Sequence, residues 1–262
     1  LANKDINAIA IATPAATHFK LAKAALMSGK DVFVEKPIAL NLDDAEELVK
    51  IANDNDKILM VGHLLQYHTG FLKLKEMVIS GKLGELQYIY SNRLNLGKFR
   101  KEENILWSFA PHDVSMIINL FQALPEKVTA IGSTYLQNKI ADVTTTHLQF
   151  PDGKNAHIYV SWLHPYKEQK LVVIGDRGMA VFDDGRDWDE KLSFYAHEVR
   201  WNNDLPIPKP AKSELIKIAI SEPLKLEAEH FIESISNRTK PRTDGLEGKM
   251  VLSVLDAAEK SM

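Results

Sequence analysis

Apolar runs and helix-like segments alternate over the first third of the chain. Apolar runs that end in turn residues predict buried strands, and apolar positions that recur every three to four residues predict helices. The expected strands are 6–12, 31–35 and 58–62, and the expected helices are 17–28, which stops at Gly29, and 41–53, which Asn41 caps. The first strand is a short apolar run, so we expect it to be buried on both faces. The alternation predicts parallel strands joined by right-handed crossovers, which is half of a doubly wound Rossmann-type sheet.

Strands dominate after a helix expected over 70–80. The expected strands are 87–96, 127–136, 143–150, 155–163, 169–174, 179–182 and 191–195, and the further helices are 111–121, 223–236 and 245–261. Hairpin turn signals at 151–153 and 176–178 favour a mostly antiparallel sheet, and residues 205–210, with three prolines, are expected to be a loop. The predicted fold is a partial Rossmann-type (α/β) domain over residues 1–84, followed over residues 85–262 by an α+β domain with a large, mostly antiparallel sheet.

The composition limits the kind of partner. With 45% hydrophobic residues among 262, the chain can bury one large core or two ordinary cores, and we expect two. Its 32 basic residues nearly balance its 35 acidic residues. No overall field would hold it to nucleic acid or to an anionic membrane, so a small molecule is the expected partner. The sequence has no cysteine, which suits a reducing cytoplasm, and no apolar run approaches transmembrane length. We expect a cytoplasmic protein.

Polar residues after the first three strands are the candidates for chemistry, because open α/β sheets bind ligands beyond the carboxyl ends of their strands. Lys36 stands out, since it closes a buried strand and precedes Pro37, whose ring restricts the backbone. Partial desolvation suits a lysine to proton transfer or to polarising a hydroxyl. The alternative is a surface lysine that begins a loop. The polar and loop residues at these strand ends are Thr13, Pro14, His18, Glu35, Lys36, His63, Gln66 and His68.

Three segments, in this order and spacing, resemble the Gfo/Idh/MocA family of oxidoreductases. They are Ala10-Ile11-Ala12-Thr13-Pro14 with Thr17-His18, then residues 29–37 with their Glu-Lys-Pro ending, then Ser80-Gly81-Lys82-Leu83-Gly84-Glu85. The resemblance covers essentially the whole chain, including residues 222–224, 230–231 and 241–255. It implies a dehydrogenase that uses NAD or NADP.

The resemblance also implies site residues. Lys36 would lie beside the nicotinamide and the substrate hydroxyl. The residues that would line the cofactor cleft are Ala12, Thr13, Pro14, His18, Glu35, Lys36 and Gln66. The family's second catalytic element is Asp-x-x-x-His at the head of a helix, and here Ser108 stands at the aspartate position before His112. Asp113 is a candidate to orient His112 or to replace the missing carboxylate, and the alternative for His112 is a capping role at the N-terminus of a core helix.

The expected reaction needs a base. A carbon that gives hydride to nicotinamide also loses its hydroxyl proton, so one base must lie within hydrogen-bond reach of that oxygen. His112 is the predicted base, and Lys36 is predicted to stabilise the developing alkoxide and to help relay the proton. The predicted activity is hydride transfer between NAD(P) and a secondary hydroxyl of a sugar.

A group of cations indicates the kind of sugar. Residues 91–101 with 104–107 and 161–165 resemble the UDP-N-acetylglucosamine 3-dehydrogenase branch of the family, which implies a UDP-amino sugar as substrate. Guanidinium groups bind diphosphate in a bidentate fashion, and a tryptophan ring stacks on a sugar or base. The substrate residues so implied are Arg93, Asn95, Trp107, His112 and Asp113, with Lys98, Arg100 and Lys101 as further cations. The alternative is a solvated loop, with Trp107 and Trp162 in the core.

The family's glycine-rich Gly-x-Gly-x-x-Gly turn, which precedes these strands by roughly 60 residues and binds the pyrophosphate, does not occur in the sequence. We therefore expect an N-terminally truncated chain, in which NAD cannot be told from NADP. A catalytically silent sugar-binding or dimerisation module stays open as a second class. A metal hydrolase that uses His63 and His68 is a remote third, because their spacing gives little reason to expect zinc. We expect no metal, and a homo-oligomer formed through the second-domain sheet.

Overall fold

The structure is a computed structural model that describes residues 1–97, 99–209 and 211–262. The chain forms two compact units. Unit 1 comprises residues 1–67 and 222–257, and unit 2 comprises residues 68–221 and 258–262. Within the described part of the chain, no helix has both the length and the apolar character needed to cross a membrane.

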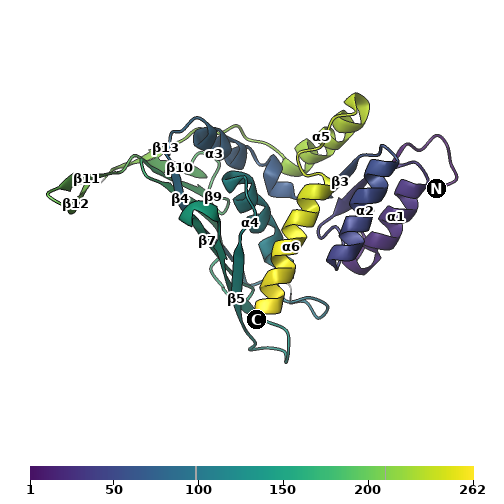
Figure 1. Cartoon of the computed structure of the whole chain (residues 1–262), viewed down its shortest axis with the longest axis horizontal. Coiled ribbons are helices and arrows are strands. Elements are labelled where there is room, and N and C mark those ends of the chain that lie inside the picture. The colour runs from purple at the N-terminus through teal and green to yellow at the C-terminus, as the bar shows by residue number, and fades with distance from the viewer. Residues whose placement is uncertain (98, 210) are drawn as a thin grey trace. The chain divides into compact units, whose positions relative to one another are not determined.

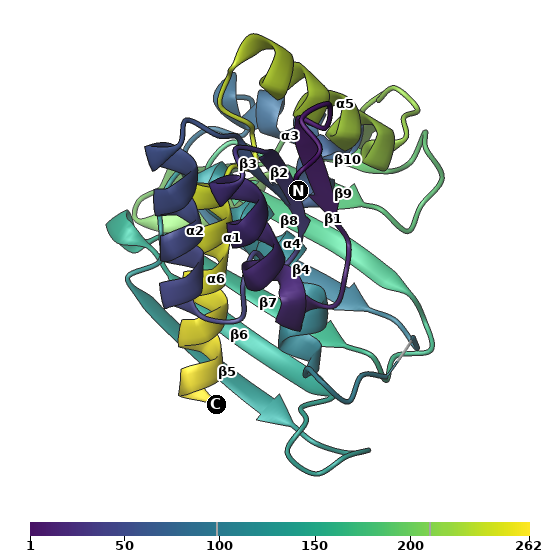
Figure 2. The same ribbon diagram turned by 90° about the vertical axis from the view of Figure 1, so that its right-hand side faces the viewer.

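Unit 1 is built on a parallel three-stranded sheet, as the alternating pattern predicts. Its strands are β1 (Ala8–Ile11), β2 (Asp31–Glu35) and β3 (Leu59–Gly62), in the order β1-β2-β3. A short 3-10 helix, η1 (Ala15–Thr17), leads into α1 (His18–Met27), and α2 (Leu42–Asp54) connects β2 to β3. The two α-helices lie side by side (Figure 2). The predicted partial Rossmann fold is confirmed.

Local signals explain where these helices begin and end. The Asn41 side chain accepts a hydrogen bond from the Asp44 amide, 2.9 Å long, which caps α2. Gly29 has a φ of +74°, the left-handed conformation that ends α1. The expectation that the first strand is buried on both faces is wrong, because β1 is an edge strand of the sheet in the described residues and leaves Ala10 exposed.

Two C-terminal helices complete unit 1. They are α5 (Pro223–Asn237) and most of α6 (Gly245–Ser261), whose residues from 258 onward are assigned to unit 2. A short 3-10 helix, η2 (Leu64–Tyr67), follows β3. Phe231 of α5 packs against Met60 and Tyr67. A Cβ atom on Gly248 would lie 2.6 Å from Val61, so only glycine lets α6 approach β3 this closely. Unit 1 thus contains helical residues from the C-terminal part of the chain. The division into domains 1–84 and 85–262 stays a prediction.

Unit 2 is an eight-stranded, mostly antiparallel sheet, as predicted. Its strands are β4 (Leu86–Leu94), β5 (Lys127–Ser133), β6 (Val143–Gln149), β7 (Asn155–Ser161), β8 (Glu168–Gly175), β9 (Met179–Asp183), β10 (Leu192–Tyr195) and β13 (Ser213–Leu215), in the order β13-β10-β9-β8-β4-β7-β6-β5. Only β4 and β7 pair in parallel among the described strands of this sheet. The predicted turns at 151–153, described as the 3-10 helix η3 (Pro151–Gly153), and at 176–178 connect antiparallel neighbours.

Two helices of unit 2 matter for the site, α3 (Thr69–Ile79) and α4 (Ile105–Phe121). The expected start of α4 at residue 111 is wrong. The helix begins six residues earlier, where the Asn104 side chain accepts from the Trp107 amide, and Pro111 lies inside it. Burial of Ile105 and Leu106 favours the longer helix although the proline removes one backbone donor. His112 therefore lies in the interior of a helix and does not cap one.

The expected loop over 205–210 is also wrong. Residues Leu205–Lys209 form β12, which pairs with β11 (Glu198–Asn202) in a hairpin that extends away from the eight-stranded sheet (Figure 1); Pro210 lies outside the described residues. Asn203 and Asp204 both have positive φ, the geometry of a two-residue type I′ turn. Proline is tolerated in such an edge ribbon, because alternate positions need no backbone donor.

Candidate active site

The carboxyl ends of β1, β2 and β3 meet at one edge of unit 1, because the strands are parallel. His18 is 1% exposed and joins the first two strand ends. Its Nε2 lies 2.8 Å from the carbonyl oxygen of Thr13, and its Nδ1 lies 2.7 Å from that of Pro37. Both ring nitrogens contact protein carbonyls, so His18 is placed to brace the two loops.

Exposure differs among the predicted cofactor residues. Lys36 is half-buried between the half-buried Glu35 and the buried Pro37. Gln66 is 1% exposed, and its backbone carbonyl oxygen accepts a 2.9 Å hydrogen bond from the Arg242 guanidinium. The exposed residues at this edge are Ala12, Thr13 and Pro14. The groups that a ligand can reach are therefore the loop after β1 and, in part, the Glu35-Lys36 pair at the end of β2.

This edge suits one half of a nicotinamide dinucleotide. The exposed Thr13 hydroxyl, 2.6 Å from that of Thr17, and the Lys36 ammonium are donors, and Glu35 supplies an acceptor. A carboxamide and ribose hydroxyls need such a mixture of donors and acceptors. The donor set therefore fits the nicotinamide and its ribose, whereas a glycine-rich turn for the pyrophosphate does not occur in the sequence.

A cavity of about 390 Å³ opens elsewhere in unit 1. It lies at the amino end of β3, where Ile58 and Leu59 face Pro241 and Leu246. None of the predicted site residues lines it. The candidate site is therefore identified by the carboxyl ends of the parallel strands, because the predicted residues lie there and not in this cavity.

Helix α4 carries the second predicted element, in unit 2. Ser108 and His112 are one helical turn apart and share a side of α4, and both are half-buried. Asp113 follows His112 by about 100° around the helix and is 1% exposed. His112 is thus partly accessible, whereas its neighbour Asp113 is buried.

Asp113 forms a buried ion pair with Arg93 of β4. Arg93 Nε donates to Asp113 Oδ2 at 2.7 Å and Nη2 donates to Oδ1 at 3.1 Å, while the Ser91 hydroxyl donates to Oδ1 at 2.5 Å. Burial alone would lower the pKa of Arg93, but the charge of Asp113 raises it above its usual value. Each partner is occupied by the other, so these contacts support an anchoring role for α4 on the sheet more than a role on substrate.

Trp107 and Trp162 differ in their surroundings. Trp162 is fully buried, and its indole N–H donates to Asp142 Oδ1 at 2.5 Å, so it is a core residue. Trp107 is half-buried, and its indole N–H donates to Glu259 Oε2 at 3.0 Å. Its ring is therefore oriented by a carboxylate and keeps an accessible part.

The predicted cations of the 91–101 segment are not alike. Arg100 and Lys101 are exposed, whereas Arg93 is buried. Arg100 Nε lies 3.6 Å from Glu103 Oε1, so these two residues form a surface ion pair. Asn95 is half-buried, and its backbone N–H donates a 3.0 Å hydrogen bond to the Ser161 backbone carbonyl. Lys98 lies outside the described residues.

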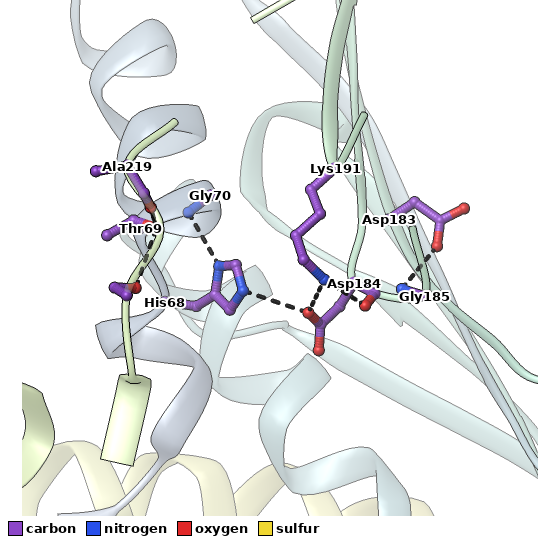
Figure 3. A network of polar contacts seen from close by, with 9 residues as sticks. His68, Thr69, Gly70, Asp183, Asp184, Gly185, Lys191 and Ala219 are labelled. Atoms are coloured by element: carbon purple, nitrogen blue, oxygen red, sulfur yellow. Dashed lines mark hydrogen bonds and ion pairs between the residues drawn. The ribbon is translucent and has the colours of Figure 1, made fainter. Parts of the chain in front are cut away.

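A buried polar network in unit 2 was not predicted (Figure 3). His68 accepts a hydrogen bond from the Gly70 amide through Nδ1, so its other nitrogen, Nε2, lies as a donor 3.3 Å from Asp184. Lys191 donates to the same carboxylate at 2.8 Å, and the Trp188 ring stacks on His68. No local pattern could have revealed it, because His68 caps the N-terminus of α3 whereas Asp184, Trp188 and Lys191 lie between β9 and β10.

The charge of Asp184 makes this network sensitive to acid. Burial alone would raise the pKa of its carboxyl, but the hydrogen bonds from His68 and Lys191 lower it to about 2. A depressed carboxyl pKa stabilises the fold above the unfolded value near 4, and this stabilisation is lost as pH falls toward 2. We expect Asp184→Asn to lose about 2 kcal/mol of unfolding free energy at pH 7 and much less at pH 2.5.

Urea unfolding followed by circular dichroism at the two pH values measures this loss. Asp189→Asn, an exposed aspartate of the same turn, is the matched control and should change stability little at either pH. An equal loss at pH 7 and pH 2.5 would contradict the electrostatic origin.

The two histidines considered for a metal lie in different compact units. His63 Nδ1 is 2.6 Å from Glu247 Oε2, whereas His68 pairs with Asp184. Among residues 1–97, 99–209 and 211–262, no three His, Asp or Glu side chains gather as a metal site would require. Each histidine is thus part of its own unit's polar packing.

A parallel strand-and-helix unit with donors at its carboxyl edge and a second unit with a large, mostly antiparallel sheet are the architecture expected of an NAD-binding oxidoreductase with a Rossmann fold. A family model described as an oxidoreductase family with an NAD-binding Rossmann fold matches residues 1–63. The model of the GFO/IDH/MocA C-terminal domain matches residues 71–181. The chain belongs to the Gfo/Idh/MocA family of oxidoreductases, which confirms the resemblance found in the sequence.

Some relatives match nearly the whole chain. The UDP-N-acetylglucosamine 3-dehydrogenase of Acidithiobacillus ferrooxidans is 25% identical over 260 residues, which cover 95% of this chain and 76% of that protein. The inositol 2-dehydrogenase of Rhizobium meliloti is 25% identical over 269 residues, which cover 98% and 79%.

Solved structures share the fold at lower identity. The structure of the Acidithiobacillus ferrooxidans enzyme matches with a TM-score of 0.86 at 23% identity, over 98% of this chain and 79% of that one. An aldose-aldose oxidoreductase of Caulobacter crescentus matches with a TM-score of 0.81 at 20% identity, over 99% and 78%. At these identities the likeness concerns the fold alone.

Proposed function

We propose that the protein transfers a hydride between NAD(P) and a secondary hydroxyl of a sugar. The observation that carries the proposal is the place of Lys36, half-buried at the carboxyl end of β2 in a sheet whose family binds NAD. A cation there stabilises the negative charge that develops on a hydroxyl oxygen as its proton leaves. The relatives support the same reaction class, since they are named as dehydrogenases of an amino sugar nucleotide and of inositol.

Each predicted residue has a proposed role in this reaction. The cofactor, when bound, accepts the hydride. His112 takes the hydroxyl proton as general base, and Lys36 stabilises the alkoxide and helps to relay that proton. The nicotinamide end would be held by Ala12, Thr13, Pro14, Glu35 and Gln66, and His18 holds two of their loops together.

The substrate we propose is a UDP-amino sugar. The exposed cations Arg100 and Lys101 suit a diphosphate better than the buried Arg93 does, because Arg93 is already paired. The accessible part of Trp107 suits a sugar or base ring, and Asn95 is a candidate for its polar groups. Asp113 is occupied by Arg93 and is no longer proposed as a substrate contact. A relative that acts on a UDP-amino sugar supports this choice.

A coupled binding and turnover experiment tests the proposal. NADH is titrated into the protein and followed by nicotinamide fluorescence, and then UDP-N-acetylglucosamine and NAD are mixed with it while absorbance at 340 nm is recorded. We expect saturable binding and substrate-dependent formation of NADH, with myo-inositol as the comparison substrate. Sugar binding without NADH formation, unchanged in Lys36→Ala, would instead identify a catalytically silent module.

We further propose that the protein is cytoplasmic and forms a homo-oligomer through the unit 2 sheet. On the sheet, Tyr90 stacks on His157 with ring centroids 5.3 Å apart, and Ile131 is 71% exposed. Aromatic and apolar side chains on a sheet surface favour pairing with a second sheet. Sedimentation equilibrium with Ile131→Lys tests this, since a subunit contact there would be weakened.

A further inference from the structure

The cavity of about 390 Å³ in unit 1 lies at the opposite end of β3 from the candidate active site. Residues from the C-terminal half of α2, the start of β3 and the first turn of α6 line it. Its volume is within the range of roughly 300–1,000 Å³ that is typical of small-molecule sites. Much of its wall is apolar, and the side chains that provide this wall are Val49, Ala52, Ile58, Leu59, Pro241 and Leu246.

The charged groups that line the cavity are Lys57, Lys240 and Asp244. Both oxygens of the Asp244 carboxylate have partners. Oδ1 accepts a 2.9 Å hydrogen bond from the Glu247 amide, and Oδ2 lies 2.9 Å from the Lys240 ammonium. Lys57 is half-buried, and its ammonium has neither a hydrogen bond nor an ion pair in the described part of the chain. The cavity therefore carries one uncompensated positive charge.

This charge and the apolar wall make different demands on a ligand. A half-buried ammonium has lost part of its hydration without gaining a partner, so it favours a negatively charged group. The start of α6 adds to this preference, because Gly245 and Leu246 line the cavity and the N-terminus of a helix carries a partial positive charge. An inorganic anion would leave the apolar wall in water, and a neutral apolar molecule would leave Lys57 unpaired. The two features together suit a ligand with an apolar body and one negative charge.

We propose that this cavity binds a small organic monoanion, an apolar ring or short chain that carries one carboxylate. The carboxylate pairs with the Lys57 ammonium, and the apolar body lies against Ile58, Leu59 and Leu246. The site shares no residue with the candidate active site, so its ligand binds without the cofactor and takes no part in hydride transfer.

Isothermal titration calorimetry with probes of one shape and different charge tests the proposal. The probes are 3-phenylpropionate, 3-phenylpropanol and 3-phenylpropylamine, which carry a negative charge, no charge and a positive charge. We expect 3-phenylpropionate to bind about tenfold more tightly than the alcohol, because a hydrogen bond between two charged groups is stronger than a bond to a neutral group. The amine should bind more weakly than the alcohol, since its charge repels that of Lys57.

Variants of the lining residues separate the contribution of the charge from that of the wall. Lys57→Met keeps an apolar stem of similar length and removes the charge, so it should weaken 3-phenylpropionate about tenfold and change the affinity for the alcohol less than about twofold. Lys50→Met, at an exposed lysine of α2 outside the cavity, is the matched control and should bind both probes as wild type does. Leu246→Ala removes part of the wall and should weaken the acid and the alcohol by a similar factor.

Three results would overturn the proposal: no binding of any probe, equal affinity for the acid and the alcohol, or unchanged binding of the acid to Lys57→Met. Lys36→Ala distinguishes this cavity from the candidate active site, and it should bind 3-phenylpropionate as wild type does. Loss of binding in that variant would place the probe at the candidate active site instead. The titration uses neither NAD nor a sugar, so a failure of turnover would count against the proposed function and leave this site unaffected.

Discussion

Asp113→Ala is expected to lower the free energy of unfolding by about 3–5 kcal/mol, the largest stability effect of any single substitution considered for this protein. The change leaves the Arg93 guanidinium, whose side chain is 11% exposed, without its counter-charge, and it removes the acceptor of the Ser91 hydroxyl. A buried charge that loses its partner keeps its desolvation cost and loses the compensating attraction.

Urea unfolding monitored by far-UV circular dichroism measures this loss. Asp187→Ala, at an exposed position, is the control and should stay within about 0.5 kcal/mol of wild type. The double variant Arg93→Met with Asp113→Leu should recover much of the stability, because an apolar pair of similar volume often replaces a buried ion pair at little cost. A loss of under about 1 kcal/mol in Asp113→Ala would show that the pair is hydrated in solution.

His112→Asn is expected to lower kcat for sugar oxidation by about 10²–10⁴-fold, the largest effect on activity. Asparagine keeps a polar group on α4 but cannot take the hydroxyl proton. The substitution should leave NADH binding unchanged, since no predicted cofactor residue lies on α4. It should also remove the rise of kcat with pH that a neutral imidazole base produces.

Initial rates at saturating NAD and sugar nucleotide, across pH 6 to pH 9, check this expectation. His147→Asn, an exposed histidine on β6, is the matched control. Combining His112→Asn with Lys36→Met tests whether the two groups serve one step, because residues that act as a unit lose less together than the product of their separate losses. A kcat for His112→Asn within about threefold of wild type would exclude it as the general base.

Local patterns predicted most of the secondary structure because the information is local. The apolar run of β2, the Asn41 cap and Gly29 each act over a few residues, and each is where the sequence analysis expected it. The same is true of the turns at 151–153 and 176–178, whose residues favour tight hairpins.

Two of the three wrong expectations, the start of α4 and the loop over 205–210, arose where distant contacts outweighed a local preference. Pro111 marks a helix start by its own chemistry, yet α4 begins at Ile105 because the buried residues before the proline pack into unit 2. The prolines of 205–210 indicated a loop, but a partner strand and the turn at Asn203 and Asp204 fold them into a hairpin.

The sequence by itself determined the parallel sheet, the sheet-rich second unit, the family and the strand ends at which Lys36 lies, because hydrophobic period and strand direction are written in neighbouring residues. Only the tertiary structure decided which charges are buried and with whom: Arg93 with Asp113, and His68 with Asp184. Each of these pairs joins residues far apart in the chain. Their protonation depends on burial and on a neighbour's charge, and both of these quantities exist only after the chain has folded.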